Sequence, residues 1–161
     1  MKAAIVYHSQ TGNTKTMAEV IAEGMNTVAG VEAKTFPIDA VDEDWMKESQ
    51  CVIMGSPSYY ADVSGAMKTF LETCGKYGLA GKLGGAFATA NYIHGGGEIV
   101  MQTIMTHMHV FGMMTYSGGG SYGKPVIHLG PVAVAGKLDE SKDTFQLYGQ
   151  RMATQAAKLF N

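Results

Sequence analysis

Cysteine, charge and long apolar runs are all scarce in this sequence. Two cysteines, Cys51 and Cys74, in 161 residues are too few for a disulfide framework, and their spacing excludes a Cys-x-x-Cys redox pair. Cys51 opens an apolar run and Cys74 ends a helical pattern, so we expect both to be reduced packing residues. No apolar run reaches the roughly 18 residues of a membrane span, and the first run is too short for a signal peptide. The sequence therefore predicts a soluble, cytoplasmic protein.

The charge balance excludes strongly charged classes of protein. Lysine and arginine number 12 and aspartate and glutamate 14, which gives a formal net charge of -2. Because no basic excess is present to neutralise a phosphate backbone, we do not expect nucleic-acid binding. A hydrophobic content of 46% supports a buried core and excludes general disorder. We interpret residues 1–161 as one domain.

Short apolar runs alternate with amphipathic segments along the chain. The predicted strands are 3–7, 31–36, 50–55 and 85–90, with a fifth strand in two pieces at 113–117 and 125–129. The predicted helices are 14–28, 63–76, 98–111 and 139–160, with a short helix in the acidic segment 39–48. Strand followed by helix, five times, predicts an α/β fold in which helices cover both faces of a parallel sheet. Ligands bind beyond the carboxyl ends of such strands, so the loops after the first, third and fourth strands are the candidate site.

The first of these loops has the composition of a phosphate site. Residues 9–14 (Ser-Gln-Thr-Gly-Asn-Thr) place three hydroxyl side chains and a glycine between a buried strand and a helix. The first turn of a helix has unpaired N–H groups and the positive end of the helix dipole, which together bind anions. Ser, Thr and Asn also suit a simple N-cap, which is the alternative interpretation. Four such residues around one glycine favour phosphate.

The other two loops offer aromatic rings and closely approaching backbone. Residues 56–62 place Tyr59 and Tyr60 at the tip of a buried strand, where a flat conjugated ring can stack, although both could instead be packing residues at the rim. Residues 91–97 contain three consecutive glycines, which let the backbone approach a heterocycle. Together, the loops predict a site for flavin mononucleotide (FMN). The predicted cofactor-binding residues are Ser9, Gln10, Thr11, Gly12, Asn13, Thr14, Pro57, Ser58, Tyr59, Tyr60, Ala61, Asp62, Thr89, Ala90, Asn91, Tyr92, Gly95 and Gly96.

The histidines point to no metal site and give one candidate near the cofactor. His107 and His109 are two residues apart, so on a helix they face different directions and make a poor metal pair. His128 lies in a predicted apolar strand and is interpreted as a core residue. His94, in the third loop, is the histidine that we place near the flavin ring, where it could donate a hydrogen bond to flavin or to a bound quinone. His94 and Tyr60 are the candidates for a catalytic role, and no catalytic acid is assigned.

These loop sequences resemble a known superfamily. Residues 9–14 resemble the phosphate signature of the flavodoxin superfamily. The segments similar to its WrbA-like NAD(P)H:quinone oxidoreductase branch are 55–60, 64–72, 95–98, 112–113 and 118–124. The resemblance covers nearly the whole chain. It implies a flavodoxin-like three-layer sandwich with a five-stranded parallel sheet in the order 2-1-3-4-5.

The resemblance also implies an activity. A WrbA-like protein uses FMN to pass electrons from NADH or NADPH to a quinone-like acceptor and forms a homo-oligomer, a dimer or tetramer. The alternative is a flavodoxin-type carrier that serves a redox protein partner, for which an acidic docking face is usual. Asp62 is the only acidic residue in the three loops, which disfavours the carrier. A flavin-binding regulatory module without turnover is the third possibility.

Overall fold

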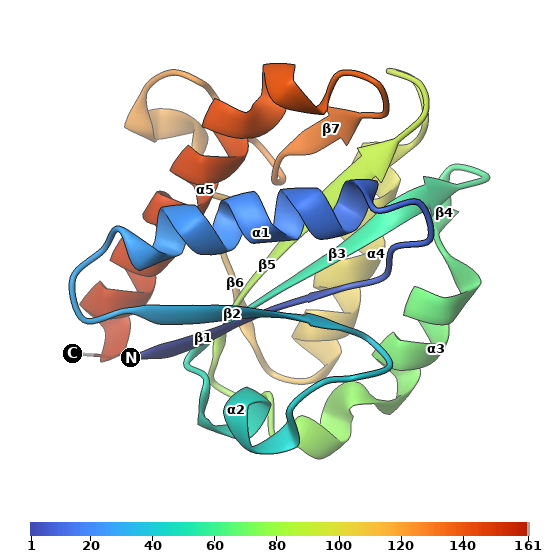
Figure 1. Ribbon diagram of the computed structural model, residues 1–161. Helices are drawn as coiled ribbons and strands as arrows, with labels where there is room; N and C mark the ends of the chain where they lie inside the picture. The colour runs from blue at the N-terminus through green and yellow to red at the C-terminus, as the bar shows by residue number, and fades with distance from the viewer. Residues whose placement is uncertain (161) are drawn as a thin grey trace.

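The computed structural model describes residues 1–160, in which strands and helices alternate as predicted (Figure 1). The strands are β1 (Lys2–Tyr7), β2 (Glu32–Pro37), β3 (Cys51–Tyr59), β4 (Asp62–Val63), β5 (Leu83–Ala90), β6 (Met114–Thr115) and β7 (Val132–Val134). The helices are α1 (Asn13–Asn26), α2 (Glu43–Glu48), α3 (Gly65–Thr73), α4 (Gly97–Val110) and α5 (Leu138–Phe160), with 3-10 turns at Cys74–Tyr77 and Gly120–Tyr122. Within residues 1–160, none of the helices combines the length and the apolar character that a bilayer crossing demands.

The central sheet has the predicted strand order. Its strands run β2-β1-β3-β5-β6, and every pair along this path is parallel. Two short strands share the fifth position, because β6 pairs with the start of β5 and β7 pairs with its end. The α/β fold and the flavodoxin-like order 2-1-3-4-5 are therefore confirmed, with the fifth strand split.

The second piece of the fifth strand lies later than predicted. Residues 125–129 form no strand, and His128 is exposed rather than a core residue, so both predictions were wrong. The strand forms at β7 instead, after Gly130. A Cβ atom on Gly130 would lie 2.2 Å from the carbonyl oxygen of Ala86, so only glycine lets the chain come this close to β5. The position of the strand thus depends on this close approach and not on the apolar run before it.

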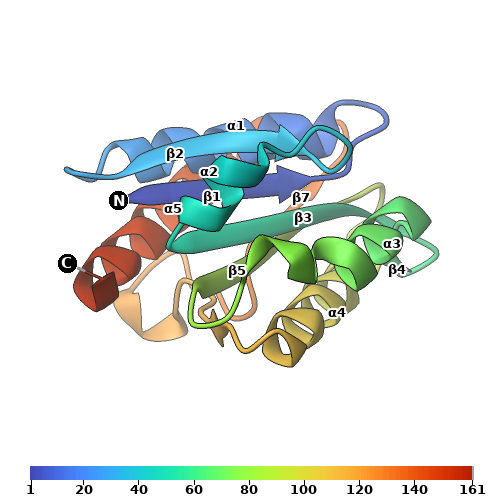
Figure 2. The same cartoon turned by 90° about the horizontal axis from the view of Figure 1, so that it is seen from below.

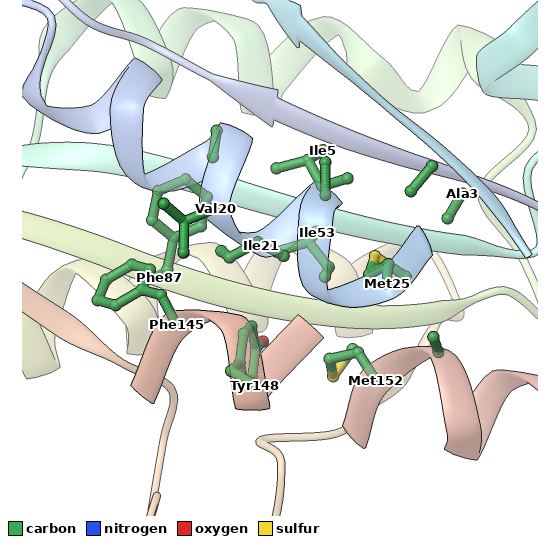
Figure 3. Close-up of a cluster of buried hydrophobic side chains, with 14 of the residues drawn as sticks. Ala3, Ile5, Val20, Ile21, Met25, Ile53, Phe87, Phe145, Tyr148 and Met152 are labelled. Carbon is green, nitrogen blue, oxygen red and sulfur yellow. The ribbon is translucent and has the colours of Figure 1, made fainter. Parts of the chain in front are cut away.

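Helices cover both faces of the sheet, with α1 and α5 on one side and α3 and α4 on the other (Figure 2). Alternation along β1 decides which side chain enters which layer. Ile5 points towards α1 and α5, whereas Ala4 and Val6 point towards α3 and α4. Figure 3 shows the first layer, in which Phe87 of β5 meets Phe145 of α5 edge to face, with ring centroids 5.9 Å apart.

The backbones of α1 and α5 touch along a seam built on two glycines. A Cβ atom on Gly24 would lie 2.0 Å from the carbonyl oxygen of Gln146, and one on Gly149 would lie 2.2 Å from that of Ile21. No side chain larger than hydrogen fits at either position without moving a helix. We call this contact the α1–α5 seam; it holds α1, and with it the loop that precedes α1, against the rest of the molecule.

Sulfur-containing side chains serve the core, as predicted for the two cysteines. Met101 and Met108 of α4 are buried against the sheet, and Met105 packs beside them. Cys51 and Cys74 are buried free thiols. Burial raises the pKa of Cys51 to about 12 and that of Cys74 to about 11, so both stay protonated and unreactive.

Candidate functional site

The three predicted loops meet at one edge of the sheet. The carboxyl ends of β1, β3 and β5 lie side by side because Tyr7 pairs with Gly55, which in turn pairs with Phe87. In Figure 1 this edge is on the right, where α1 begins. A cavity of about 80 Å³ opens there, which we call the inner cavity. Its lining comes from all three loops: Gln10, Thr11, Asn13, Thr14, Pro57, Ser58, Tyr59, Thr89, Ala90 and Asn91.

Helix α1 begins at the inner cavity without a side-chain cap. Its N-cap is Gly12, whose φ of 92° is a conformation that glycine adopts easily, and in the part of the chain that the structure describes no side-chain cap bonds to the first turn. The Gly12 N–H donates to Ser9 Oγ (3.2 Å), which shapes the loop before the helix. Elsewhere, Asp42 caps α2 and Ser64 caps α3. The alternative interpretation of residues 9–14 as a simple N-cap is therefore wrong, and the first-turn N–H groups are open to a ligand.

Two threonine hydroxyls form the base of the inner cavity. Thr14, in the first turn of α1, and Thr89, near the end of β5, have their Oγ1 atoms 2.8 Å apart. Their residues are only 1% and 4% exposed. The pair connects the two elements between which the inner cavity opens.

Among the described residues 1–160, no charged side chain lines the inner cavity. Lys15, the nearest cation in sequence, lies on α1 with its Nζ 3.9 Å from a carboxylate oxygen of Glu19. An anion in this cavity would therefore be held by neutral hydrogen-bond donors and by the N-terminus of α1.

The second loop is a β-hairpin and not the irregular loop that we predicted. Strand β3 continues to Tyr59 and pairs antiparallel with β4, which leaves Tyr60 and Ala61 as a two-residue turn. Both have positive φ, 51° and 64°, as a type I′ turn requires. Such turns favour Asn and Gly, and Tyr-Ala lacks that signal, which is why the sequence did not reveal the hairpin.

The hairpin is fastened to the third loop. Ser58 Oγ donates to the carbonyl oxygen of Gly95. Gly96 lies against the turn so closely that a Cβ atom on it would be 2.6 Å from Ala61 Cα. Asp62 Oδ1 accepts from Thr103 Oγ1 of α4 at 2.8 Å. Asp62 and Gly96 thus hold the loops together, but they line neither the inner cavity nor the wider depression beside it.

A wider depression lies beside the inner cavity, between the hairpin and the third loop. Its volume is about 1000 Å³, and we call it the outer depression. Tyr60 is fully exposed and Tyr92 is 74% exposed, so both rings are available for stacking. The exposed His94 lies in the same depression. Its lining residues are Ser58, Tyr59, Tyr60, Ala61, Val63, Gly65, Asn91, Tyr92, His94 and Gly95.

His8 packs behind the site against Tyr59, a role that was not predicted from the sequence. Its Nδ1 lies 2.7 Å from Ser64 Oγ, and its ring meets that of Tyr59 edge to face at 6.3 Å. Tyr59 in turn donates from its hydroxyl to Gln10 Oε1 (2.9 Å). The available signal was a polar residue directly after an apolar strand and directly before the phosphate-type loop.

The surroundings of His8 keep it neutral. Burial lowers its pKa, and this outweighs the opposite effect of the Asp39 carboxylate. Ser64 Oγ, which accepts from the Met67 N–H, lies 2.7 Å from His8 Nδ1, so a hydrogen bond joins the two side chains. His8 therefore supports Tyr59 from a position that favours its uncharged form.

Comparison with known proteins agrees with this architecture. The sequence model of the family described as NADPH-dependent FMN reductase matches residues 1–124. Over 160 residues the chain is 41% identical to a flavodoxin of Clostridium saccharobutylicum, covering 99% of this chain and 100% of the relative. It is 32% identical over 144 residues to an NAD(P)H dehydrogenase (quinone) of Geotalea daltonii, covering 71% and 69% of the two chains. The solved structure of a flavodoxin, WrbA-like protein of Agrobacterium tumefaciens superposes with a TM-score of 0.81 at 24% identity, over 98% of each chain, which shows a shared fold.

The family match and the coverage of both relatives fit the sheet order and the uncapped α1 at its carboxyl edge. The superfamily that the three loops resemble is thereby confirmed. The chain belongs to the NADPH-dependent FMN reductase family and is a flavodoxin-like flavoprotein.

Proposed function

We propose that this flavoprotein is an oxidoreductase that passes electrons from NADH or NADPH to a quinone-like small acceptor. The observation that carries the proposal is the pairing of two adjacent spaces. The inner cavity offers neutral donors at a free helix N-terminus, and the outer depression offers exposed aromatic rings. The first suits the phosphate of FMN, and the second suits a planar ring and a second planar substrate beside it.

The lining residues fit FMN in their chemistry. We assign the phosphate to the open N–H groups of the first turn of α1 and to the hydroxyls of Thr11 and Thr14. Tyr59 would flank the ring, and backbone from the third loop would meet its edge. FMN supplies two-electron redox chemistry when bound. The chain would position the cofactor. Because the lining residues are uncharged, the negative charge of the phosphate would be stabilised by the α1 dipole and by neutral hydrogen-bond donors alone.

We assign the second substrate to the outer depression. Tyr60 and Tyr92 would stack on a planar substrate, because both rings are exposed towards solvent. His94 is the histidine that lines this depression, and we assign it the role of donating a hydrogen bond to the quinone-like substrate.

Asp62, the only carboxylate in the three loops, accepts hydrogen bonds from Thr103 and from the backbone N–H of Val63. We place the activity in the cytoplasm, where the two buried thiols stay reduced.

The experiment that tests the proposal is steady-state oxidation of NADH and NADPH with a benzoquinone, by protein reconstituted with FMN. We expect rates well above those of an equal concentration of free FMN. Rates equal to those of free FMN would contradict the enzyme assignment. Size-exclusion chromatography of the same preparation tests the homo-oligomer, which remains a prediction.

A matched pair of variants connects this activity to the inner cavity. Asn13→Asp adds a negative charge among the donors while keeping a residue that suits the start of a helix. Gln102→Glu adds the same charge on the exposed face of α4. We expect Asn13→Asp to lose at least about tenfold in FMN affinity, as for one lost hydrogen bond to a charged group. Gln102→Glu should bind FMN like the unchanged protein; equal losses in both variants would contradict the assigned cradle.

A one-electron carrier is the second candidate, because the 41%-identical relative is named a flavodoxin. A carrier delivers electrons to a protein partner and needs no substrate depression. Redox titration of the FMN-loaded protein separates the two candidates. Two well-separated one-electron steps, together with failure to oxidise NADH or NADPH, would favour the carrier. A single two-electron step supports the enzyme.

A further inference from the structure

The Thr14–Thr89 pair has one more proton than its own contact uses. The two hydroxyls carry two protons, and one of them lies in the 2.8 Å contact between the oxygens. Within residues 1–160, neither oxygen makes another hydrogen bond. Both residues are more than nine-tenths buried, and both line the inner cavity. Because a buried hydroxyl without a partner is costly, the spare proton requires an acceptor in the cavity.

The position of the pair decides which hydroxyl holds the spare proton when an anion is bound. Thr14 is in the first turn of α1, where the helix dipole and the open N–H groups attract negative charge. Thr89 is on β5, one residue before the strand ends. If the Thr89 hydroxyl donates its proton to Thr14 Oγ1, the proton of the Thr14 hydroxyl is free to point to the anion. The opposite direction would point the lone pair of Thr14 at the anion, which is repulsive.

We infer that Thr89 is a positioning residue for the cofactor phosphate: its hydroxyl donates to Thr14 Oγ1 and so fixes Thr14 as a donor to a phosphate monoester. This inference rests on the proposed FMN site and adds a residue that acts through another. The side chains that touch the phosphate then come from the first loop, but one of them is oriented from β5, 75 residues further along the chain. The hydrogen bond from Thr89 to Thr14 and the hydrogen bond from Thr14 to the phosphate run in the same direction. Each bond therefore polarises and strengthens the other.

Three single variants, and the double variant of Thr14→Val with Thr89→Val, test the role of Thr89. Thr89→Val keeps the shape and removes the hydroxyl, Thr89→Ser keeps the hydroxyl, and Thr14→Val removes the donor itself. The measurement is the dissociation constant of FMN and of riboflavin, which lacks the phosphate, followed by quenching of flavin fluorescence. Thermal unfolding without flavin reports the structural effect of each substitution.

We expect Thr89→Val to weaken FMN binding about 3- to 10-fold, the range for one hydrogen bond, and to leave riboflavin binding unchanged. Thr89→Ser should bind FMN like the unchanged protein. Thr14→Val with Thr89→Val should be no weaker than Thr14→Val alone, because Thr89 acts only through Thr14.

Three results would overturn the inference. An unchanged FMN constant in Thr89→Val would exclude any role for its hydroxyl. Equal losses for FMN and riboflavin, or full additivity in the double variant, would mean that the pair is only a structural link between α1 and β5. All three leave the proposed function intact. Failure of the unchanged protein to bind FMN would instead overturn the proposed function, and this inference with it.

Discussion

The α1–α5 seam and the site edge both depend on glycine, for opposite purposes. In the seam, Gly24 and Gly149 let two helix backbones touch, and no space remains. At the site edge, Gly12 begins α1 without a side-chain cap and leaves donors free beside a cavity. A chain can thus use the same residue to exclude solvent in one region and to hold backbone groups ready for a ligand in another. The comparison predicts that substitutions in the seam change stability, whereas changes at the edge alter ligand binding.

The largest effect is expected in the seam. Gly149→Ala places a Cβ atom 2.2 Å from a backbone oxygen, so α1 and α5 must move apart. We expect a loss of about 3 kcal/mol in the free energy of unfolding, measured by urea denaturation, as for overpacking of a rigid core. Gly65→Ala is the control, because a Cβ atom there meets nothing within 4 Å. A loss below about 1 kcal/mol in Gly149→Ala would show that the seam is adaptable.

FMN binding at the site edge should raise the free energy of unfolding by nearly as much as Gly149→Ala lowers it. At 100 times its dissociation constant, FMN should raise the free energy of unfolding by about 2.7 kcal/mol. The measurement is the unfolding midpoint with and without FMN, in the unchanged protein and in Gly149→Ala. The same increase in both would show that the two regions act independently. A midpoint indifferent to FMN would contradict the site assignment.

The capped start of α2, away from the inner cavity, should show the ordinary cost of losing a cap. Asp42 Oδ1 accepts from the Trp45 N–H at 2.9 Å and caps α2. Asp42→Ala should cost about 1 kcal/mol in the free energy of unfolding and leave FMN affinity unchanged. Asp44→Ala, on the exposed side of the same helix, serves as the control. An Asp42→Ala protein that loses FMN would mean that α2 and the site edge are coupled.

The turn at the hairpin tip should be more stable with glycine. Tyr60 is fully exposed and has a φ of 51°, a conformation that costs a side-chain-bearing residue about 1–2 kcal/mol. Tyr60→Gly removes that cost but adds backbone entropy to the unfolded chain, so we expect a net gain of about 0.5 kcal/mol in denaturation experiments. The same variant should raise KM for the quinone, since the ring would no longer stack. Unchanged stability and an unchanged KM would contradict both roles of Tyr60.

The pH dependence of stability should report on His8. Burial lowers its pKa in the folded state, so below the ordinary value of about 6.5 the unfolded chain binds more protons than the folded one. Stability contributed by neutral His8 is therefore present above pH 6.5 and falls as the pH drops from 6.5 towards the folded pKa. His8→Asn, which keeps a hydrogen-bonding side chain beside Ser64 but does not titrate, should flatten this slope in urea denaturation at pH 5 to 7. The control is His128→Asn, at an exposed position; a slope that His8→Asn leaves unchanged would contradict the assignment.

Much of the architecture was predictable because local patterns report on burial. Continuous apolar runs mark strands that are covered on both faces, and the three strands β1, β3 and β5 were found in this way. The prediction of a strand at 125–129 was wrong because an apolar run alone does not show whether that segment lies close enough to the edge of the sheet to pair with it. The hairpin tip escaped prediction because Tyr60 and Ala61 take positive φ under the constraint of the pairing between β3 and β4.

The sequence by itself determined the alternation of strands and helices, the reduced packing cysteines and the composition of the three loops. These features follow from residue type and spacing, because hydrophobic periodicity and local backbone preferences act over a few residues. Only the tertiary structure decided that α1 lacks a cap, that His8 supports Tyr59 and that Thr89 meets Thr14. Such contacts join residues up to 75 positions apart, and their geometry depends on how strands pair and helices pack. No local preference encodes a distance between two hydroxyls on different elements, which is why the fold was predictable and the orientation of its donors was not.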